Sequence, residues 1–369
     1  MSTTGRPESS ADAATLAERC REAAFVRLVA RPDGDAVAAA GLLARACAAT
    51  RTPYQVSVAT TRGAASDRLL AGAADDATLA LGFEGTPADA TLTGDTLSPA
   101  AFDAARELHD SEPSLALAGV RATGAVPPEE LAEAFERRPG VGLPVADLAD
   151  GLAHATLLHA DWSGDDRQAG ALLAELALPA ELDDDARRRL ASRVALDATE
   201  NAAPRAVGAL DGVLRPHVTP DGPFETAEGY ADVLDCLAAR EPGLAAALAL
   251  GVADRPTALD AWREHASATH AALRTADPAR YSGLVACEAD APAWPLARLV
   301  RDTRADEPAA LVVGDDGAVL ATTPDGPDAR GTLAAALDDD AVAGASTHAR
   351  TDESDAETVI DAVREVCSG

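Results

Sequence analysis

The sequence contains no lysine, few aromatic side chains and no long apolar run. All 31 basic side chains among the 369 residues are arginine, and Phe, Trp and Tyr together make up 3% of the chain. The five cysteines include no Cys-x-x-Cys pair, which excludes a zinc ribbon and a disulfide framework and is typical of a cytoplasmic protein. No stretch approaches the roughly 20 apolar residues of a membrane-spanning helix. Residues 1–11 are polar and lack the apolar segment of a signal peptide, so we expect a cytoplasmic location.

Acidic side chains, by contrast, are abundant. The chain carries 61 Asp and Glu residues and a formal net charge of −30. Excess carboxylates, absent lysine and many alanines predict a halophilic protein, because a hydrated acidic surface keeps a protein soluble in molar salt. At ordinary ionic strength this charge would oppose contact with phosphates, but at about 1 M salt the Debye length falls to about 3 Å. The composition therefore excludes tight, sequence-independent electrostatic binding of nucleic acid and leaves local contacts open.

Strand and helix patterns alternate in the first third of the chain. Short apolar runs that predict strands occupy residues 24–30, 54–60 and 77–83. An Ala-rich helix is expected over residues 35–50, ended by Pro53. Alternation with short connections predicts a parallel sheet with helices on its faces.

A second α/β pattern covers residues 283–366, after an amphipathic helix expected over residues 254–277. Within it, the apolar residues 311–313 and 318–320 flank an Asp-Gly sequence, which predicts a β-hairpin. The overall expectation is an α/β protein with two sheets, the second one smaller.

Two carboxylates lie one residue apart where the first predicted strand meets its helix. Gly34 allows a turn between Asp33 and Asp35, and both side chains would lie at the carboxyl edge of the sheet, where open α/β proteins bind ligands. Hard divalent cations prefer several oxygen ligands, so Asp33 and Asp35 are candidate metal ligands. The alternative is an acidic loop with a helix N-cap.

Three segments resemble the DHH phosphoesterases, in particular the archaeal RecJ-like proteins. Pro32-Asp33-Gly34-Asp35-Ala36 and the small-residue helix behind it resemble the first motif of that family. Residues 115–124 resemble the stretch that carries the fourth motif, and residues 224–251 resemble the helical segment between the two RecJ domains. The resemblance implies a polar leader and helix over 1–22, a parallel-sheet DHH domain over 23–222, a connecting helical segment over 223–277 and a smaller α/β DHHA1-like domain over 278–369.

Most of the metal ligands that the resemblance implies are absent. The family holds two ions, Mg²⁺ or Mn²⁺, with additional aspartates and an Asp-His-His sequence, and no Asp-His-His occurs here. The corresponding region offers only Asp89 and Asp95 as substitutes, and residues 122–125 lack the acid of the fourth motif. Asp33 and Asp35 alone could hold a single Mg²⁺ that keeps several waters.

The histidines do not replace these ligands. His154 with His159, and His265 with His270, are each five residues apart, which is not the spacing of one helix face, so we expect structural or surface roles for them. Residues 343–350 resemble the Gly-rich, His-containing loop with which DHHA1 domains hold substrate, and His348 and Arg350 are the candidate substrate-binding residues there. A polar loop before the last helix is the alternative for this segment.

These observations leave three functions open. The resemblance, which includes Cdc45-type scaffolds that bind GINS and helicase, favours a catalytically degenerate RecJ-like component of DNA replication or repair. Its partners would be replication or repair proteins such as a GINS-type protein, with single-stranded nucleic acid as a further candidate. The second function is a metal-dependent single-strand exonuclease or nucleotide phosphoesterase that uses Asp33 and Asp35. The third is an interaction protein unrelated to DNA, since a fold does not determine a function.

Overall fold

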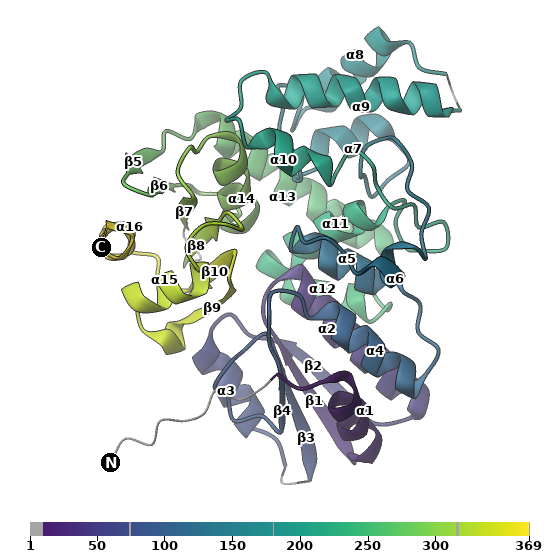
Figure 1. Cartoon of the computed structure of the whole chain (residues 1–369), viewed down its shortest axis with the longest axis vertical. Coiled ribbons are helices and arrows are strands. Elements are labelled where there is room, and N and C mark those ends of the chain that lie inside the picture. The colour runs from purple at the N-terminus through teal and green to yellow at the C-terminus, as the bar shows by residue number, and fades with distance from the viewer. Residues whose placement is uncertain (1–9, 74, 180, 315–316, 369) are drawn as a thin grey trace.

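A computed structural model of the chain describes residues 10–73, 75–179, 181–314 and 317–368. Two sheets occupy separate parts of the molecule, and a helical region lies beside both (Figure 1). The first part contains α1 (Ala13–Glu22), β1 (Phe25–Ala30), α2 (Gly34–Thr50), β2 (Tyr54–Val58), α3 (Arg62–Leu70), β3 (Asp76–Leu81), β4 (Ala90–Leu92), α4 (Ser98–Leu108) and α5 (Ser114–Ala122). The helix α1 confirms the expected N-terminal helix, while residues 1–9 of the expected leader lie outside the described residues.

The N-terminal sheet is parallel throughout, as the alternating pattern predicts. Its strand order is β2-β1-β3-β4. The two faces of β1 pack into different cores: Val26 and Leu28 belong to the same core as residues of α1, α2 and α4, whereas Val29 belongs to a separate core with Ala65 and Leu69 of α3. Helices therefore cover both faces of this sheet (Figure 1).

The helix α2 begins and ends where the sequence signals its limits. Asp33 is its N-cap, and the carboxylate accepts a hydrogen bond from the Ala36 amide. The helix ends at Arg51, which has a left-handed backbone (φ 62°), two residues before Pro53. Small residues along α2 allow neighbouring helices to come close; a Cβ at Gly41 would lie 2.7 Å from the Ala249 carbonyl oxygen.

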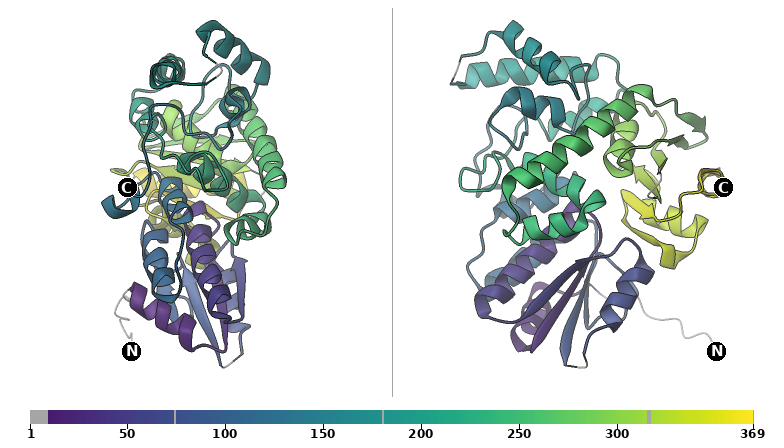
Figure 2. Two further views of the ribbon diagram at one scale, coloured as in Figure 1. Left: turned by 90° about the vertical axis from the view of Figure 1, so that its right-hand side faces the viewer. Right: turned by 180° about the vertical axis from the view of Figure 1, so that it is seen from behind.

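The middle of the chain is helical. It comprises α6 (Glu129–Ala132), α7 (Leu148–His154), α8 (Asp166–Leu176), α9 (Asp184–Thr199), α10 (Ala206–Asp211), α11 (Ala227–Arg240), α12 (Pro242–Ala249) and α13 (Arg255–Thr275). Helix α11 packs against α2, α5, α12 and α13, so it belongs to the same core as the N-terminal sheet. Helices α7 to α10 form a second apolar core. The long helix α13 is best seen from behind, where it runs between these helices and the C-terminal sheet (Figure 2).

The C-terminal sheet is mixed. Its elements are β5 (Ala279–Tyr281), β6 (Leu284–Glu288), α14 (Ala293–Thr303), β7 (Ala309–Gly314), β8 (Gly317–Thr322), α15 (Ala329–Ala336), the short 3-10 helix η1 (Asp339–Ala341), β9 (Val342–Ala345), β10 (His348–Thr351) and α16 (Ala356–Ser368). The strand order is β5-β6-β7-β8-β10-β9, in which only β6 and β7 are parallel neighbours. Helix α14 packs on one face, and α15 and α16 pack on the other.

Two sequence expectations for this region have different outcomes. The hairpin of β7 and β8 is confirmed by the pairing of Gly314 with Gly317, although the turn residues Asp315 and Asp316 lie outside the described residues. Residues 343–350, for which a polar loop is the alternative, instead lie in the hairpin β9–β10, whose side chains are mostly buried.

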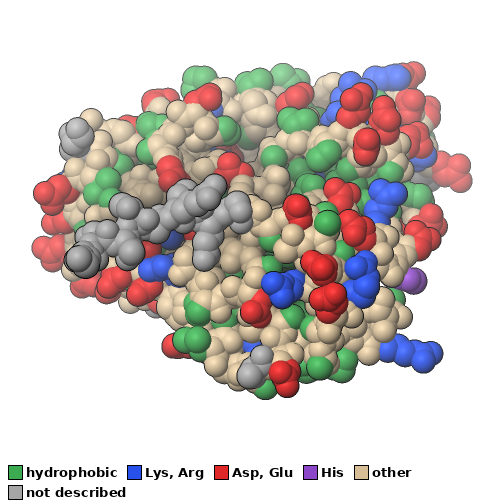
Figure 3. All heavy atoms as spheres, turned by 60° about the horizontal axis from the view of Figure 1, so that its bottom comes forward, with side chains coloured by type: hydrophobic (Ala, Val, Ile, Leu, Met, Phe, Trp, Pro, Cys, Tyr) green, Lys and Arg blue, Asp and Glu red, His purple; other side chains and the backbone are tan. Residues whose placement is uncertain are grey.

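The surface reflects the composition. Acidic side chains spread over the face shown in Figure 3, with arginines interspersed among them. Across the part of the chain that the structure describes, none of the helices is both long enough and apolar enough to cross a membrane.

Candidate functional site

Asp33 lies at the carboxyl end of β1, at the edge where the sequence predicts a site. The side chain is 4% exposed, and its second oxygen accepts a hydrogen bond from Nε of Arg31 in a close ion pair. Nε2 of His348 lies 3.5 Å from the same oxygen. Burial disfavours the charged carboxylate, but Arg31 and His348 outweigh burial, so the pKa of Asp33 lies well below its usual range. Asp33 is therefore an ionised partner of Arg31 and the cap of α2.

Asp35 is fully buried and accepts hydrogen bonds at the start of α4 rather than of α2. Its two oxygens accept hydrogen bonds from the backbone amides of Leu97 and Ser98, where α4 begins. The first amides of a helix have no partner inside the helix, so a carboxylate at that position satisfies them. Burial and the nearby charge of Asp33 raise the pKa of Asp35. Both oxygens of Asp35 are thus engaged by the protein itself.

Two further buried carboxylates stand on α11 next to the Asp33 loop. Asp235 accepts a hydrogen bond from the Gly34 amide (3.0 Å) and another from the Trp294 indole. Asp232 accepts hydrogen bonds from the Thr156 amide (3.0 Å) and the Trp262 indole (2.9 Å). Burial raises the pKa of both aspartates.

The guanidinium of Arg298 lies between these two carboxylates. Its nitrogens are 3.6 Å from Asp232 and 3.5 Å from Asp235. Arg298 comes from α14, which packs on the C-terminal sheet, so the ion pairs connect that sheet to α11. A buried arginine between two carboxylates neutralises charge that the interior could not otherwise hold.

The hairpin β9–β10 closes over the Asp33 loop. Nη1 of Arg31 donates a hydrogen bond to the Gly344 carbonyl (2.8 Å), which lies 313 positions away in the sequence. The ring of His348 packs against Trp294, with ring centroids 4.5 Å apart. Arg350 donates a hydrogen bond to the Ala239 carbonyl (3.3 Å). The two candidate substrate-binding residues, His348 and Arg350, therefore lie beside the Asp33 loop and line the same small cavity of about 20 Å³.

This arrangement does not fit a two-metal centre. Such a centre needs several carboxylate oxygens that point into a common space with free lone pairs. Here a guanidinium, two indoles and five backbone amides engage the oxygens of the four aspartates. A cation would also meet the positive charge of Arg31 and Arg298 at close range.

Asp89 and Asp95, the two substitute metal ligands that the sequence offers, make their contacts with other parts of the protein. The exposed carboxylate of Asp89 accepts hydrogen bonds from the amide and hydroxyl of Thr78 (2.8 and 2.7 Å). Asp95, which is also exposed, accepts a hydrogen bond from the Ser346 amide (3.2 Å). Within the described residues, neither has a contact with Asp33 or Asp35 that would complete a ligand set.

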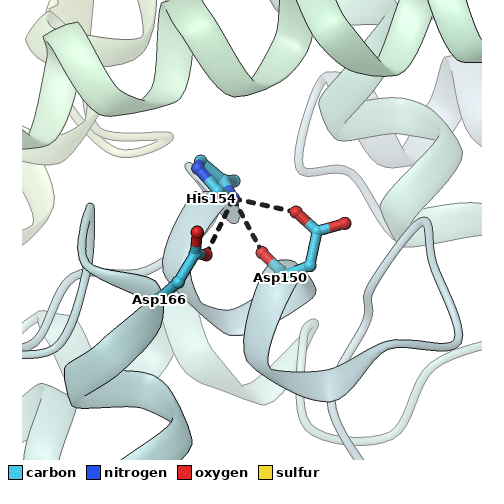
Figure 4. Close-up of side chains that lie close together, drawn as sticks. All are labelled: Asp150, His154 and Asp166. Atoms are coloured by element: carbon cyan, nitrogen blue, oxygen red, sulfur yellow. Dashed lines mark hydrogen bonds and ion pairs between the residues drawn. The ribbon is translucent and has the colours of Figure 1, made fainter.

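One cluster of metal-binding residue types occurs among the described residues, at Asp150, His154 and Asp166 (Figure 4). Nδ1 of His154 lies 2.9 Å from the Asp150 carbonyl, so this nitrogen carries a proton and has no lone pair for a metal. Arg263 already binds both carboxylate oxygens of Asp150, at 2.9 and 2.8 Å. The cluster is therefore an ion-pair network that joins α7 and α13.

One histidine from each of the two sequence pairs, His159 and His270, meets the other in the structure. His159 and His270 stack, with Nδ1 atoms 3.1 Å apart, and Nε2 of His270 donates to the Ala155 carbonyl (3.2 Å). Burial lowers the pKa of His159 to about 4 and that of His270 to about 3. These neutral rings connect the loop after α7 to α13, which is the structural role expected of them.

Relatives of the chain can be recognised by sequence. The family model described as "Uncharacterized protein rrnAC1427, C-terminal domain" matches residues 276–365. The chain is 48% identical over 381 residues to the protein rrnAC1427 of Haloarcula marismortui, covering 99% of this chain and 100% of that protein. The chain belongs to the rrnAC1427 family. Family membership extends over the whole chain and not only over the C-terminal sheet.

Solved structures show what fold the family has. The crystal structure of CDC45 from Entamoeba histolytica superposes with a TM-score of 0.60 and 11% identity, covering 96% of this chain and 97% of that chain. RecJ from Thermus thermophilus in complex with Mn²⁺ has a TM-score of 0.45 and 15% identity, covering 96% of this chain and 54% of that one. The fold of this chain is thus similar to that of the CDC45 structure, with a parallel sheet followed by a smaller α/β part, and the predicted fold class is confirmed.

Sequence reasoning missed the buried network around Arg298. A signal was present in α11, where Asp232 and Asp235 interrupt an otherwise apolar run. Carboxylates in such a run require buried donors, so they predict that cationic or N–H-bearing side chains from elsewhere pack against them. Which residues supply these donors, here Trp294 and Arg298, depends on the tertiary structure.

Proposed function

We propose that this protein is a catalytically degenerate DHH-fold component of DNA replication or repair that acts by binding other macromolecules. The observation that supports the proposal is the ion pair of Arg31 with Asp33, in which a side-chain cation already occupies an oxygen of one of the two candidate metal ligands. The engagement of Asp35 by two backbone amides supports the same conclusion. A chain that keeps the fold while its own N–H groups occupy the candidate metal ligands is better suited to binding other macromolecules than to metal-dependent catalysis.

The resemblance to Cdc45-type scaffolds supports the replication or repair context. The partner class is then a replication or repair protein such as a GINS-type protein, in the cytoplasm of a cell with molar internal salt. The charge of −30 supports protein partners over tight binding of nucleic acid. The division into a DHH-like domain over 23–222, a connecting segment over 223–277 and a DHHA1-like domain over 278–369 is part of this proposal.

The competing enzyme would be a Mg²⁺- or Mn²⁺-dependent exonuclease or phosphoesterase that uses Asp33 and Asp35 as ligands. It would also use His348 and Arg350 to hold substrate. For that, Arg31 would have to leave Asp33 and the hairpin β9–β10 would have to move away, since Arg31 also donates to Gly344. No contact in the described residues favours this open arrangement, so the enzyme is the second of the two candidate functions.

Purification of the native protein from its own cells tests the proposal. The chain, tagged at its C-terminus and isolated at the salt concentration of the cytoplasm, should bring down replication or repair proteins in stoichiometric amounts. A tagged protein of equal charge serves as the control for nonspecific association. Recovery as a free monomer, or with partners unconnected to DNA, would contradict the proposal and favour the interaction protein unrelated to DNA.

A further inference from the structure

The two sheets have four edge strands, and three of these edges are protected. The outer edge of β4 is covered by the segment before α1, where the Ala11 amide donates a hydrogen bond to the Thr91 carbonyl (2.8 Å). At β9, Arg31 donates to the Gly344 carbonyl (2.8 Å). The edge strand β5 is three residues long and carries the charge of Arg280. Cover, short length and charge are the means by which proteins keep sheet edges from pairing with other chains.

The fourth edge strand, β2, is unprotected over most of its length. Its five residues, Tyr-Gln-Val-Ser-Val, include no charged residue and no proline, in a chain of which 25% is charged. The register with β1, in which the Val26 amide donates to the Pro53 carbonyl, directs the backbone groups of every second residue of β2 toward β1. The amides and carbonyls of Tyr54 and Val56 therefore point outward, and none of them has a hydrogen-bond partner among the described residues.

The core of the protein holds this open edge in place. The side chains of Tyr54 and Val56 are half-buried and pack against the core that includes α2 and α12. At the carboxyl end of β2, Arg68 of α3 donates a hydrogen bond to the Val58 carbonyl. A strand that is already extended and fixed loses little conformational entropy when another strand pairs with it. Its outward amides and carbonyls match those of an extended polypeptide, which adds to a sheet through main-chain hydrogen bonds.

Positive charges stand at both ends of this edge. Arg51, which is exposed, lies just before β2, and the exposed Arg68 lies at its other end, in a chain with 61 acidic residues and 31 arginines. Two antiparallel β2 strands from two copies, paired about Val56, would bring Arg51 of one copy toward Arg68 of the other, and like charges oppose that pairing. The two arginines instead favour a strand that carries carboxylates at its ends.

From these observations we infer that β2 pairs with an extended segment of a partner protein, free of proline and with Asp or Glu near its ends. The inference rests on the binding role in the proposed function, because it names the surface through which a binding component would contact its partner. Main-chain hydrogen bonds to Tyr54 and Val56 would hold the segment, and carboxylates facing Arg51 and Arg68 would fix its register. The N-terminal sheet would then gain one strand beyond β2.

Site-specific photocrosslinking in native cells tests where the partner binds. A benzophenone amino acid replaces Gln55, which is exposed on β2, and in a control chain replaces Val126, which is 90% exposed between α5 and α6. We expect position 55 to crosslink to a proline-free segment with flanking Asp or Glu, in a protein that also copurifies with the native chain. The control position should not crosslink to that segment. Crosslinks from position 55 to a second copy of the chain, or to nucleic acid or lipid alone, overturn the inference.

Substitutions at Val56 test the strand pairing itself. Val56→Pro removes an outward amide while the amides that bond to β1 remain, so it should lower the yield of the position-55 crosslink at least about tenfold. Val56→Ile keeps the amide and the β-branched side chain and is the matched control, for which we expect an unchanged yield. Denaturant titration of both variants establishes that they fold.

Neutralisation of Arg51 gives a readout that does not depend on the folding of Val56→Pro. Arg51→Gln should lower the yield of the position-55 crosslink about threefold, the effect of losing one exposed charge pair. Arg167→Gln is the control, because Arg167 is exposed on α8 and does not adjoin β2. Equal yields from the two variants would overturn the assignment of a segment with carboxylates at its ends.

The outcomes separate the inference from the proposed function. If replication or repair proteins copurify but position 55 does not crosslink to them, or a folded Val56→Pro variant keeps the crosslink, the β2 inference is wrong and the proposed function stands. If position 55 crosslinks as expected to a protein unconnected to DNA, the proposed function is wrong and β2 remains the binding surface. If no protein copurifies with the native chain, both fail.

Discussion

At the scale of single residues, the four aspartates near the end of β1 act as hydrogen-bond acceptors inside the protein. Asp33 and Asp35 each satisfy the start of a helix, and Asp235 connects the loop between them to α11 through the Gly34 amide. A carboxylate whose oxygens already accept two or three N–H bonds has fewer lone pairs free to bind a metal ion. The same residue types that bind metal in a nuclease can therefore hold a fold together.

Replacement of Asp35 tests this structural role. Asp35→Ala leaves the buried amides of Leu97 and Ser98 without an acceptor, so it should lower the free energy of unfolding by about 2–4 kcal/mol. The control is Asp103→Ala on the exposed side of α4, expected within about 0.5 kcal/mol of the native protein. Denaturant titration in molar salt measures both. Equal stability of the two variants would show that Asp35 has no structural role.

The His159–His270 pair predicts how stability depends on pH. Both rings have folded pKa values, about 4 and about 3, below the 6.5 of an unfolded histidine, so the unfolded chain binds more protons between those values. Their contribution to stability is fully present above pH 6.5 and is lost as the pH falls toward 4 and then 3.

The variant His270→Gln should therefore show a shallower loss of stability than the native protein between pH 6.5 and 4. The expected difference in slope is at most about 1.4 kcal/mol per pH unit, the value for one proton. His109→Gln is the control, since His109 is exposed. A slope unchanged by His270→Gln would mean that the pair does not titrate as its burial implies.

The position of Asp33 and Asp35 at the carboxyl end of the first strand was predictable, whereas their partners were not. A strand, an Asp-Gly-Asp sequence and a helix are local, and local patterns determine where the side chains emerge. The partners come from distant parts of the chain, as in the 313-position separation of Arg31 and Gly344. Only the packing of the C-terminal sheet against α11 places Trp294 and Arg298 beside Asp235.

At the scale of elements, close packing of small-residue helices holds the core together. Helix α11 touches α2, α5, α12 and α13, and its Gly229 lies against the backbone of the segment before α7. A Cβ at Gly229 would lie 2.2 Å from the carbonyl carbon of Leu143 and 2.2 Å from the nitrogen of Pro144. Glycine is required at this position by contact rather than by its own backbone angles.

A matched pair of glycine substitutions tests this packing. Gly229→Ala should destabilise the protein by about 2–3 kcal/mol or more, because backbone atoms of another segment would have to move. Gly170→Ala in α8 has no heavy atom within 4 Å of the new Cβ and should stabilise the protein by about 0.5–1 kcal/mol through helix propensity. Thermal unfolding of both variants measures the difference. Similar melting temperatures would refute the close approach at Gly229.

Elements with strong periodicity were predictable, and the hairpin β9–β10 was not. The strands β1, β2 and β3 are apolar runs bounded by turn residues, and each lies within about two residues of its predicted limits. In β9 and β10 the residues are Val, Ala, Gly, His, Arg and Thr, a composition that resembles a loop. β10 pairs with β8 and β9 pairs with β10, so their strand conformation depends on joining the sheet, which is a tertiary effect.

At the scale of the whole molecule, polar contacts join the C-terminal sheet to the N-terminal sheet. Arg62 of α3 forms ion pairs with Asp339 (2.9 Å) and Asp340 (2.6 Å), and Thr60 donates to Asp352 (2.8 Å). Together with the Arg31–Gly344 hydrogen bond, these contacts connect the first sheet and its helix α3 to the hairpin β9–β10 and the segments next to it. The two sheets and the acidic surface could be predicted from the sequence. The contacts between the two sheets could not be predicted, because no local pattern encodes contacts between distant segments.

The most direct test of the central claim, that the metal site has been replaced by protein donors, is digestion of single-stranded DNA by the purified chain in high salt with Mn²⁺. We predict no processive release of mononucleotides, and the same background with Asp33→Ala as with the native protein, because Arg31 and backbone amides engage the carboxylates that ions would need. Robust release of mononucleotides that Asp33→Ala abolishes would contradict the account and establish the protein as a metal-dependent nuclease.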